Sequence, residues 1–222
     1  MRKTVIWFVS LSTLLMITLS YAFLDQPLSD FLFAHHVRTH LIPFKQAVEW
    51  PPIMSGLAPL LCVFMLGLLV RQKADAPRWV QMCFIMAISL MLTFLLKNEL
   101  KWVFSRYWPE TWTHHNLSWI QDRAYGFQWF QGKLFQGNDT TGSFPSGHAT
   151  AAFTIFWSIG LWYRRWLPLC LAVASLEGLA MVLFNYHFLS DVLAGAGLGT
   201  LCTVLCHQTF RALVREHENL IP

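Results

Sequence analysis

The chain has 222 residues, of which 55% are hydrophobic and 13% charged, with a formal net charge of +4 at pH 7. A soluble domain usually carries about 25% charged residues, so this composition excludes an ordinary soluble protein and indicates an integral membrane protein. The basic residues are dispersed along the chain, which argues against a nucleic-acid-binding surface.

Six apolar runs are candidates for spanning helices, because such a helix needs roughly 20 mostly apolar residues. In chain order they cover residues 4–23, 53–70, 79–96, 149–163, 167–185 and 192–210. The first run is long for a signal peptide and does not end at a small-residue cleavage site, so we expect it to be retained. We predict an all-α fold, with residues 1–222 forming one membrane domain, a six-transmembrane helical bundle.

Basic residues in the short connections predict the orientation of the bundle. They precede the first run, lie in the links between the second and third runs and between the fourth and fifth, and follow the sixth. These residues are Arg2, Lys3, Arg71, Lys73, Arg78, Arg164, Arg165, Arg211 and Arg215. Alternating spans place all of them, and both termini, in the cytoplasm of a plasma or bacterial inner membrane. The segments 24–52, 97–148 and 186–190 then face outward, so a long extracytoplasmic loop lies between the third and fourth helices.

The cysteines indicate neither a disulfide framework nor a zinc site. All five fall inside the predicted spans, where an apolar setting favours inert packing thiols: Cys62, Cys83, Cys170, Cys202 and Cys206. We therefore expect no metal and no other cofactor.

The third run leaves the bilayer as KNELKWVFSRYWPETW, which contains three cations. Lys97 and Lys101 are four residues apart and share one face if the helix continues, and Arg106 follows shortly after. One interpretation is that these cations anchor a helix end at the membrane interface. The other is that they bind an anion.

The fourth run begins at PSGH, residues 145–148. Pro145 suits the first turn of a helix, and Gly147 permits close approach of the backbone. The free amides of a helix start bind anions, and the Ser146 hydroxyl adds a donor. The alternative is a capping turn in which His148 is incidental.

The sixth run begins at NYHFLSDVLAG, where His187 and Asp191 are four residues apart. A carboxylate in that position can hold one imidazole nitrogen and leave the other free as a nucleophile or base. The alternative is that Asp191 or Ser190 caps the helix and that His187 is an interfacial aromatic residue.

In the predicted topology these three groups meet at one membrane face, and together they favour phosphoryl transfer. His187 would attack phosphorus with Asp191 as its partner, and His148 would protonate the leaving oxygen and then activate water. The predicted phosphate-binding residues are Lys97, Lys101, Arg106, Ser146 and Gly147. Because cations and amides carry the charge, this chemistry needs no metal.

Residues 101–195 resemble the type-2 phosphatidic acid phosphatase superfamily, which includes bacterial acid phosphatases and vanadium haloperoxidases. Its pattern is Lys-x6-Arg-Pro, Pro-Ser-Gly-His and Arg-x5-His-x3-Asp, and the second part is complete here. The resemblance implies hydrolysis of a lipid phosphate or diphosphate at the outer face, with His187 as nucleophile, Asp191 as partner and His148 as acid. Substrates in this range include undecaprenyl diphosphate, phosphatidylglycerophosphate, phosphatidate and lipid A phosphate.

Two positions depart from that pattern. Trp108 stands where the first part has its Arg, although Pro109 follows in place, and Met181 stands where the third part has its Arg. Lys97, Arg106 and Arg123 are the candidates to replace the missing charges. Two other functions stay open: a transferase that passes the phosphate to another lipid, and a lipid-phosphate-binding protein that has lost catalysis.

Glu177 is an ionisable residue inside the fifth run, and such residues are functional candidates by default. It can order a cation such as Lys97 or Lys101, or stay protonated and bond to a neighbouring helix. We favour the structural role.

Overall fold

The computed structural model describes residues 3–72, 76–111, 115–131 and 141–220, and these residues fold into helices without any β-strand. The first half contains a continuous helical segment that changes from α to π and back, then two short helices and two long ones. The second half contains two short helices and three long ones. The helices are α1 (Lys3–Leu19), η1 (Ser20–Leu24), α2 (Asp25–Ala34), α3 (Val37–Leu41), η2 (Ile42–Val48), α4 (Trp50–Gln72), α5 (Arg78–Phe104), α6 (Trp119–Asp122), α7 (Gly147–Trp162), η4 (Arg164–Trp166), α8 (Leu167–Leu183) and α9 (Leu189–Leu220).

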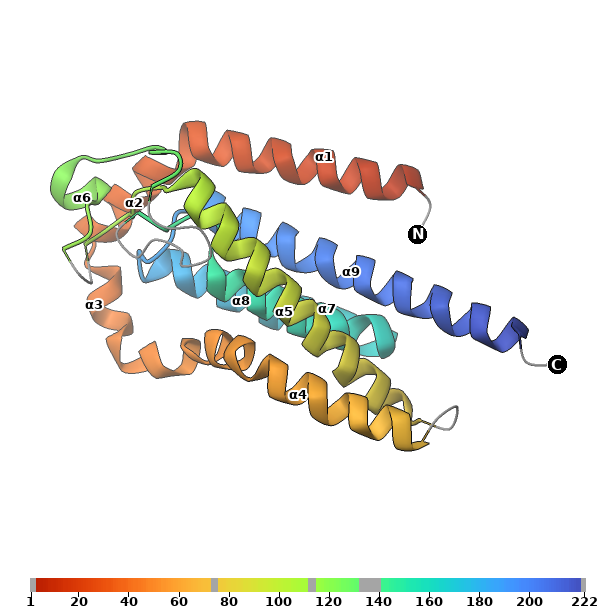
Figure 1. Ribbon diagram of the computed structural model, residues 1–222. Coiled ribbons are helices and arrows are strands. Elements are labelled where there is room, and N and C mark those ends of the chain that lie inside the picture. Colours follow the sequence, from red (N-terminus) through yellow and green to blue (C-terminus); the bar gives the residue numbers. More distant parts are fainter. Residues whose placement is uncertain (1–2, 73–75, 112–114, 132–140, 221–222) are drawn as a thin grey trace.

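The six long helices form one bundle with α7 at its centre. Helix α7 packs against α4, α5, α8 and α9, and α1 packs on the outside of α9. Figure 1 shows the short helices α2, α3 and α6 together at one end of the bundle, and both chain ends at the other. This arrangement separates a polar, loop-bearing end from the end that carries the termini.

Among the described residues, four segments are long and apolar enough to cross a membrane: Val37–Gln72, Arg78–Phe104, Arg164–Leu183 and Leu189–Val214. Helices α1 and α7, at 17 and 16 residues, fall below the usual spanning length of roughly 20. The all-α prediction is therefore confirmed, whereas helix length alone supports four spans and leaves the predicted six untested. Large apolar side chains such as Leu11, Val63 and Leu176 are 69%, 72% and 63% exposed, as expected for a surface that faces lipid.

The predicted loop over 97–148 is shorter than expected at its start. Helix α5 continues to Phe104, so Lys97 and Lys101 lie on its last two turns, and α6 interrupts the remainder. Residues 112–114 and 132–140 of this loop, with Arg2 and Lys73 of the predicted basic set, lie outside the described residues.

Two glycines bring the starts of α7 and α9 together. A Cβ atom at Gly195 would lie 2.5 Å from the carbonyl oxygen of Ser146, and one at Gly199 would lie 2.5 Å from the carbonyl oxygen of Thr150. Both distances are far inside van der Waals contact, so only glycine allows the two backbones to approach this closely. The four-residue spacing of the glycines holds the Pro-Ser-Gly-His segment against the His187–Asp191 segment.

Candidate active site

His187 and Asp191 lie side by side at the start of α9. Nδ1 of His187 is 3.7 Å from Oδ2 of Asp191, which is ion-pair contact but longer than a hydrogen bond. The same Oδ2 accepts the backbone N–H of Phe188 at 3.0 Å and the Ser143 hydroxyl. Burial lowers the pKa of His187 below its ordinary value, and the Asp191 carboxylate opposes that shift.

The Pro-Ser-Gly-His segment is joined to this pair through the backbone. Ser146 is the N-cap of α7: its Oγ accepts the N–H of Ala149 at 3.4 Å, and its own N–H donates to the Asp191 carbonyl at 3.0 Å. Pro145 therefore precedes the cap. The prediction that it lies in the first turn of the helix is wrong. The start of α7 is fixed against the start of α9, so His148 and His187 belong to one end of the bundle.

His148 is half-buried in the first turn of α7. Burial is the main cause that lowers its pKa to about 3, and the charges of His187, Lys101 and Lys97 lower it further. These three groups are thus electrostatic neighbours of His148, and the free site holds its imidazole neutral at pH 7.

Lys97 reaches across the first residue of α7. A Cβ atom at Gly147 would lie 3.2 Å from Cδ of Lys97 and 3.6 Å from its Nζ. The absence of a side chain at Gly147 therefore leaves room for the lysine beside the free amides of the helix start. A small cavity of about 50 Å³, lined in part by Thr93 and Thr150, adjoins the two residues.

Lys101 and His187 face the same tryptophan. Nζ of Lys101 lies 5.3 Å from the centre of the Trp108 ring, and that ring lies 5.3 Å from the ring of His187. Lys101 also donates to the carbonyl of Gly142. Trp108, at the sequence position where the family pattern has an arginine, thus presents an aromatic ring to both the lysine and the histidine.

Arg106 is fully buried and is held by carboxylates. Its Nη2 lies 2.7 Å from Oδ2 of Asp25, and its Nη1 contacts Oδ1 of Asp191 and lies 2.6 Å from Oγ of Ser190. Aromatic rings surround its Cζ atom at 4.4–5.4 Å: Tyr21, Tyr125, Phe127 and Phe188. This geometry favours a role in positioning Asp191 over the phosphate-binding role that the sequence suggested.

Asp25, the first residue of α2, is a further residue of the site that no sequence motif indicates. Its Oδ1 accepts the N–H of Ser190 at 3.0 Å and the Ser20 hydroxyl at 2.9 Å, and its Oδ2 accepts the Ser190 hydroxyl. Asp25 is 1% exposed. Its position in the sequence could have indicated it, because it is an acidic residue just after the first apolar run.

Met181 and Glu177 lie on α8, whereas Lys97 and Lys101 lie on α5. Met181 is fully buried in an apolar cluster with Phe184 and Val192, and its carbonyl accepts the N–H of His187 at 3.2 Å. Glu177 is 6% exposed, and its Oε1 has no hydrogen-bond partner among the described residues. Met181 therefore supports the turn before His187 and does not replace the missing charge.

Arg123 and the cysteines contribute no hydrogen bond or ion pair to the candidate site among the described residues. Arg123 lies 3.1 Å from Asp30 in an exposed ion pair. All five cysteines are free thiols. Within the described part of the chain, no group of three or more His, Cys, Asp or Glu side chains is placed to share a metal ion.

The fold is a bundle of apolar helices, as in helical membrane proteins. One end of the bundle carries a buried His–Asp pair, a capped helix start and two lysines. The family model of the PAP2 superfamily matches residues 78–215, more than half of the chain. The chain belongs to the PAP2 superfamily, which confirms the resemblance carried by its motifs.

Two curated relatives are similar over part of the chain. One is the lipid A 1-phosphatase of Rhizobium johnstonii, 31% identical over 84 residues, which cover 38% of this chain and 34% of the relative. The other is the lipid A 1-phosphatase of Rhizobium etli, 32% identical over 78 residues, which cover 35% of this chain and 34% of the relative. The matched segments thus span about a third of each relative. No solved structure shows significant similarity.

Proposed function

We propose that this chain hydrolyses a lipid phosphate through a phosphohistidine intermediate, without a metal ion. The observation that carries the proposal is the contact between His187 and Asp191 at the start of α9, held against the capped start of α7 by the backbone hydrogen bond from Ser146 to Asp191. Family membership and the two phosphatase relatives support the same reaction class.

In the first step, the Nε2 lone pair of His187 attacks phosphorus. The bond from phosphorus to the lipid oxygen breaks, and His148 donates a proton to that oxygen. Asp191 stabilises the positive charge that develops on the imidazole, because its carboxylate faces Nδ1. In the second step, His148 takes a proton from water, the hydroxide attacks phosphorus, and the N–P bond breaks to release phosphate.

The lowered pKa of His187 suits it to its role as nucleophile, whereas His148 depends on the bound substrate for its proton. His187 is neutral at pH 7 and so has a lone pair to attack with. His148 must carry a proton in the first step, and a bound phosphate dianion raises its pKa because opposite charge favours the imidazolium form. Substrate binding thus prepares the acid.

The phosphate lies between α5 and α7 in this proposal. Lys97 and Lys101 supply two positive charges, and the first amides of α7, at Gly147 and His148, supply hydrogen bonds and the positive end of the helix dipole. Ser146 contributes as the cap that fixes this helix start.

Arg106 and Asp25 position the machinery without touching the substrate. Arg106 bridges Asp25 and Asp191, so the orientation of the Asp191 carboxylate depends on helix α2. Two carboxylates and one guanidinium leave one net negative charge beside His187. That charge favours the positive imidazole of the transition state.

We assign the site to the outer face of a plasma or bacterial inner membrane, with both termini in the cytoplasm. The candidate site lies at the bundle end opposite the termini, and the basic residues in the short connections predict that the termini are cytoplasmic. Lipid A 1-phosphate is the first substrate to test, because both relatives are named for that reaction.

The test is phosphate release by the purified protein in detergent, with a chelator present, from lipid A, undecaprenyl diphosphate, phosphatidylglycerophosphate and phosphatidate. We expect release from at least one lipid and its loss in His187→Ala. His35→Ala, an exposed histidine of the same bundle end, is the matched control and keeps activity. Phosphate found only on an acceptor lipid would establish a transferase instead, and binding without turnover would establish a lipid-binding protein.

A further inference from the structure

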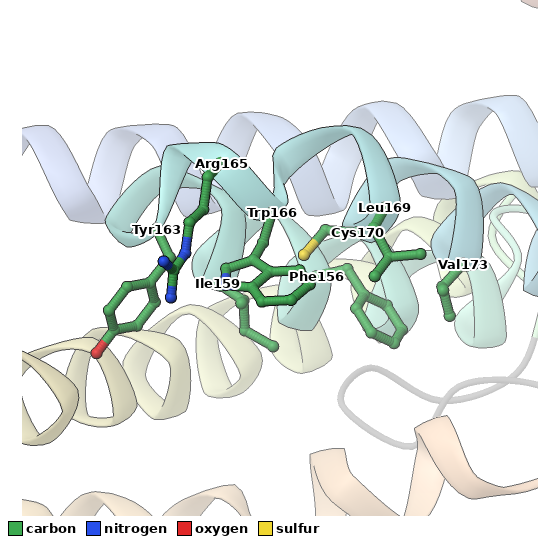
Figure 2. Close-up of a pocket in the computed structure, with 8 residues that line it drawn as sticks. All are labelled: Phe156, Ile159, Tyr163, Arg165, Trp166, Leu169, Cys170 and Val173. Carbon is green, nitrogen blue, oxygen red and sulfur yellow. The ribbon is translucent and has the colours of Figure 1, made fainter.

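A second cavity, of about 380 Å³, opens between α7 and α8 at the end of the bundle that carries the termini. Each helix contributes one face, since the lining residues recur every three or four positions. Figure 2 shows these side chains along one side of the two helices, from Tyr163 at one end to Val173 at the other. The apolar lining comprises Phe156, Ile159, Tyr163, Leu169, Cys170 and Val173.

The length of this α7–α8 groove along the helix axis matches part of a lipid tail. From Trp166 to Val173 the chain advances seven residues, or about 10 Å along a helix axis. The hydrocarbon core of a bilayer is about 30 Å thick, so the groove runs through roughly one third of it. The start of α7 lies about 24 Å from its end, so a molecule in the groove is remote from His187.

The mouth of the groove is cationic. Arg165 lines it, and its guanidinium lies 5.4 Å from the ring centre of Trp166. The adjacent Arg164 is also exposed and begins one of the four apolar spans, which places both arginines at headgroup level. None of the described residues that line the groove is acidic.

We propose that the α7–α8 groove binds an anionic membrane phospholipid, with one acyl chain against the apolar faces of α7 and α8 and the headgroup phosphate on Arg165. Charge complementarity selects this occupant, because an apolar slot closed by arginine at the cytoplasmic interface matches the anionic lipids of that leaflet. Trp166 and Tyr163 belong to the aromatic belt at the same level. The site is separate from the phosphatase centre.

The experiment is native mass spectrometry of the whole protein taken from vesicles of phosphatidylcholine and phosphatidylglycerol in equal amounts. We expect wild-type protein to retain phosphatidylglycerol several-fold more than phosphatidylcholine. Arg165→Ala should lower that preference roughly fivefold, the scale for loss of one cation near an anionic headgroup. Val173→Trp fills the apolar end of the groove and should reduce retention of both lipids.

The chain offers a matched control in Arg78 and Trp79, a second exposed Arg-Trp pair at the same end of the bundle. Trp79 is 48% exposed and Trp166 is 44% exposed, but Arg78 and Trp79 do not line the groove. Arg78→Ala should leave lipid retention unchanged. Equal loss in Arg78→Ala and Arg165→Ala, equal retention of the two lipids, or a second copy of the chain in place of lipid would each overturn the proposal. Because the readout is binding, the result does not depend on catalysis.

Discussion

The ring of Trp108 lies 5.3 Å from the ring of His187 and 5.3 Å from Nζ of Lys101. The residue that replaces a family arginine therefore packs against the proposed nucleophile. It fixes the imidazole by contact where an arginine would have added charge. In the proposed mechanism, phosphate binding then depends on Lys97, Lys101 and the start of α7.

Trp108→Ala should lower kcat by roughly 10- to 100-fold, because small displacements of a reacting group are costly. Trp108→Phe keeps an aromatic ring against His187 and should lose less. Steady-state phosphate release measures both. Trp79→Ala, at the opposite end of the bundle, is the control, and an equal effect of the three substitutions would contradict the packing role.

Arg106→Lys should destabilise the protein and lower kcat more than it raises KM. One ammonium cannot bridge Asp25 and Asp191 as the guanidinium does, and breaking a buried ion pair costs about 3–5 kcal/mol. Thermal unfolding in detergent and steady-state kinetics measure the two effects.

Asp25→Asn tests the same bridge from helix α2, and Arg123→Ala is its control, because that exposed ion pair should be worth about 1 kcal/mol or less. If Arg106→Lys raised KM alone, with kcat and stability unchanged, Arg106 would be a phosphate ligand after all.

Local contacts of the candidate site could be predicted from the sequence. His187 and Asp191 are four residues apart, and Ser146 caps a helix three residues before the amide it accepts, so spacing alone places these groups. The glycines at 195 and 199 are visible in the sequence, but their close contact with α7 is seen only in the structure.

The parts that depend on long-range packing were not predictable. Asp25 and Arg106 are 81 residues apart, and no motif marks Asp25 as a buried partner. Arg106 was expected at the phosphate because it is charged and near Lys101, yet burial turns it toward the carboxylates. The number of spans is similarly ambiguous, because α7 is central to the bundle but has only 16 residues.

Gly195→Ala should separate the two motifs and reduce activity. The added Cβ would lie 2.5 Å from the Ser146 carbonyl oxygen, so α9 must move away from α7, and overpacking of this kind costs about 1–3 kcal/mol. Phosphate release and thermal unfolding should both fall. Gly67→Ala, on α4, meets nothing within 4 Å and should be neutral or slightly stabilising; equal behaviour of the two variants would contradict the close-contact role.

The pH dependence of kcat/KM should show an acid limb below pH 6.5. His187 attacks as the neutral imidazole, and burial lowers its pKa, so activity is retained below the ordinary histidine pKa and is lost only when His187 becomes protonated. Asp191→Asn should move this limb to still lower pH, since the carboxylate raises the pKa of His187. Titration of the substrate is common to both proteins, so a limb that stays in place would exclude His187 as its source.

The most direct test of the central claim is rapid acid-free quenching of the enzyme during turnover of a lipid phosphate, followed by peptide mass spectrometry. The account predicts a phosphoryl group on His187 in the wild-type protein. His187→Ala should abolish it. Phosphate release from His187→Ala at the wild-type rate, or a phosphoryl group on another side chain, would contradict the account.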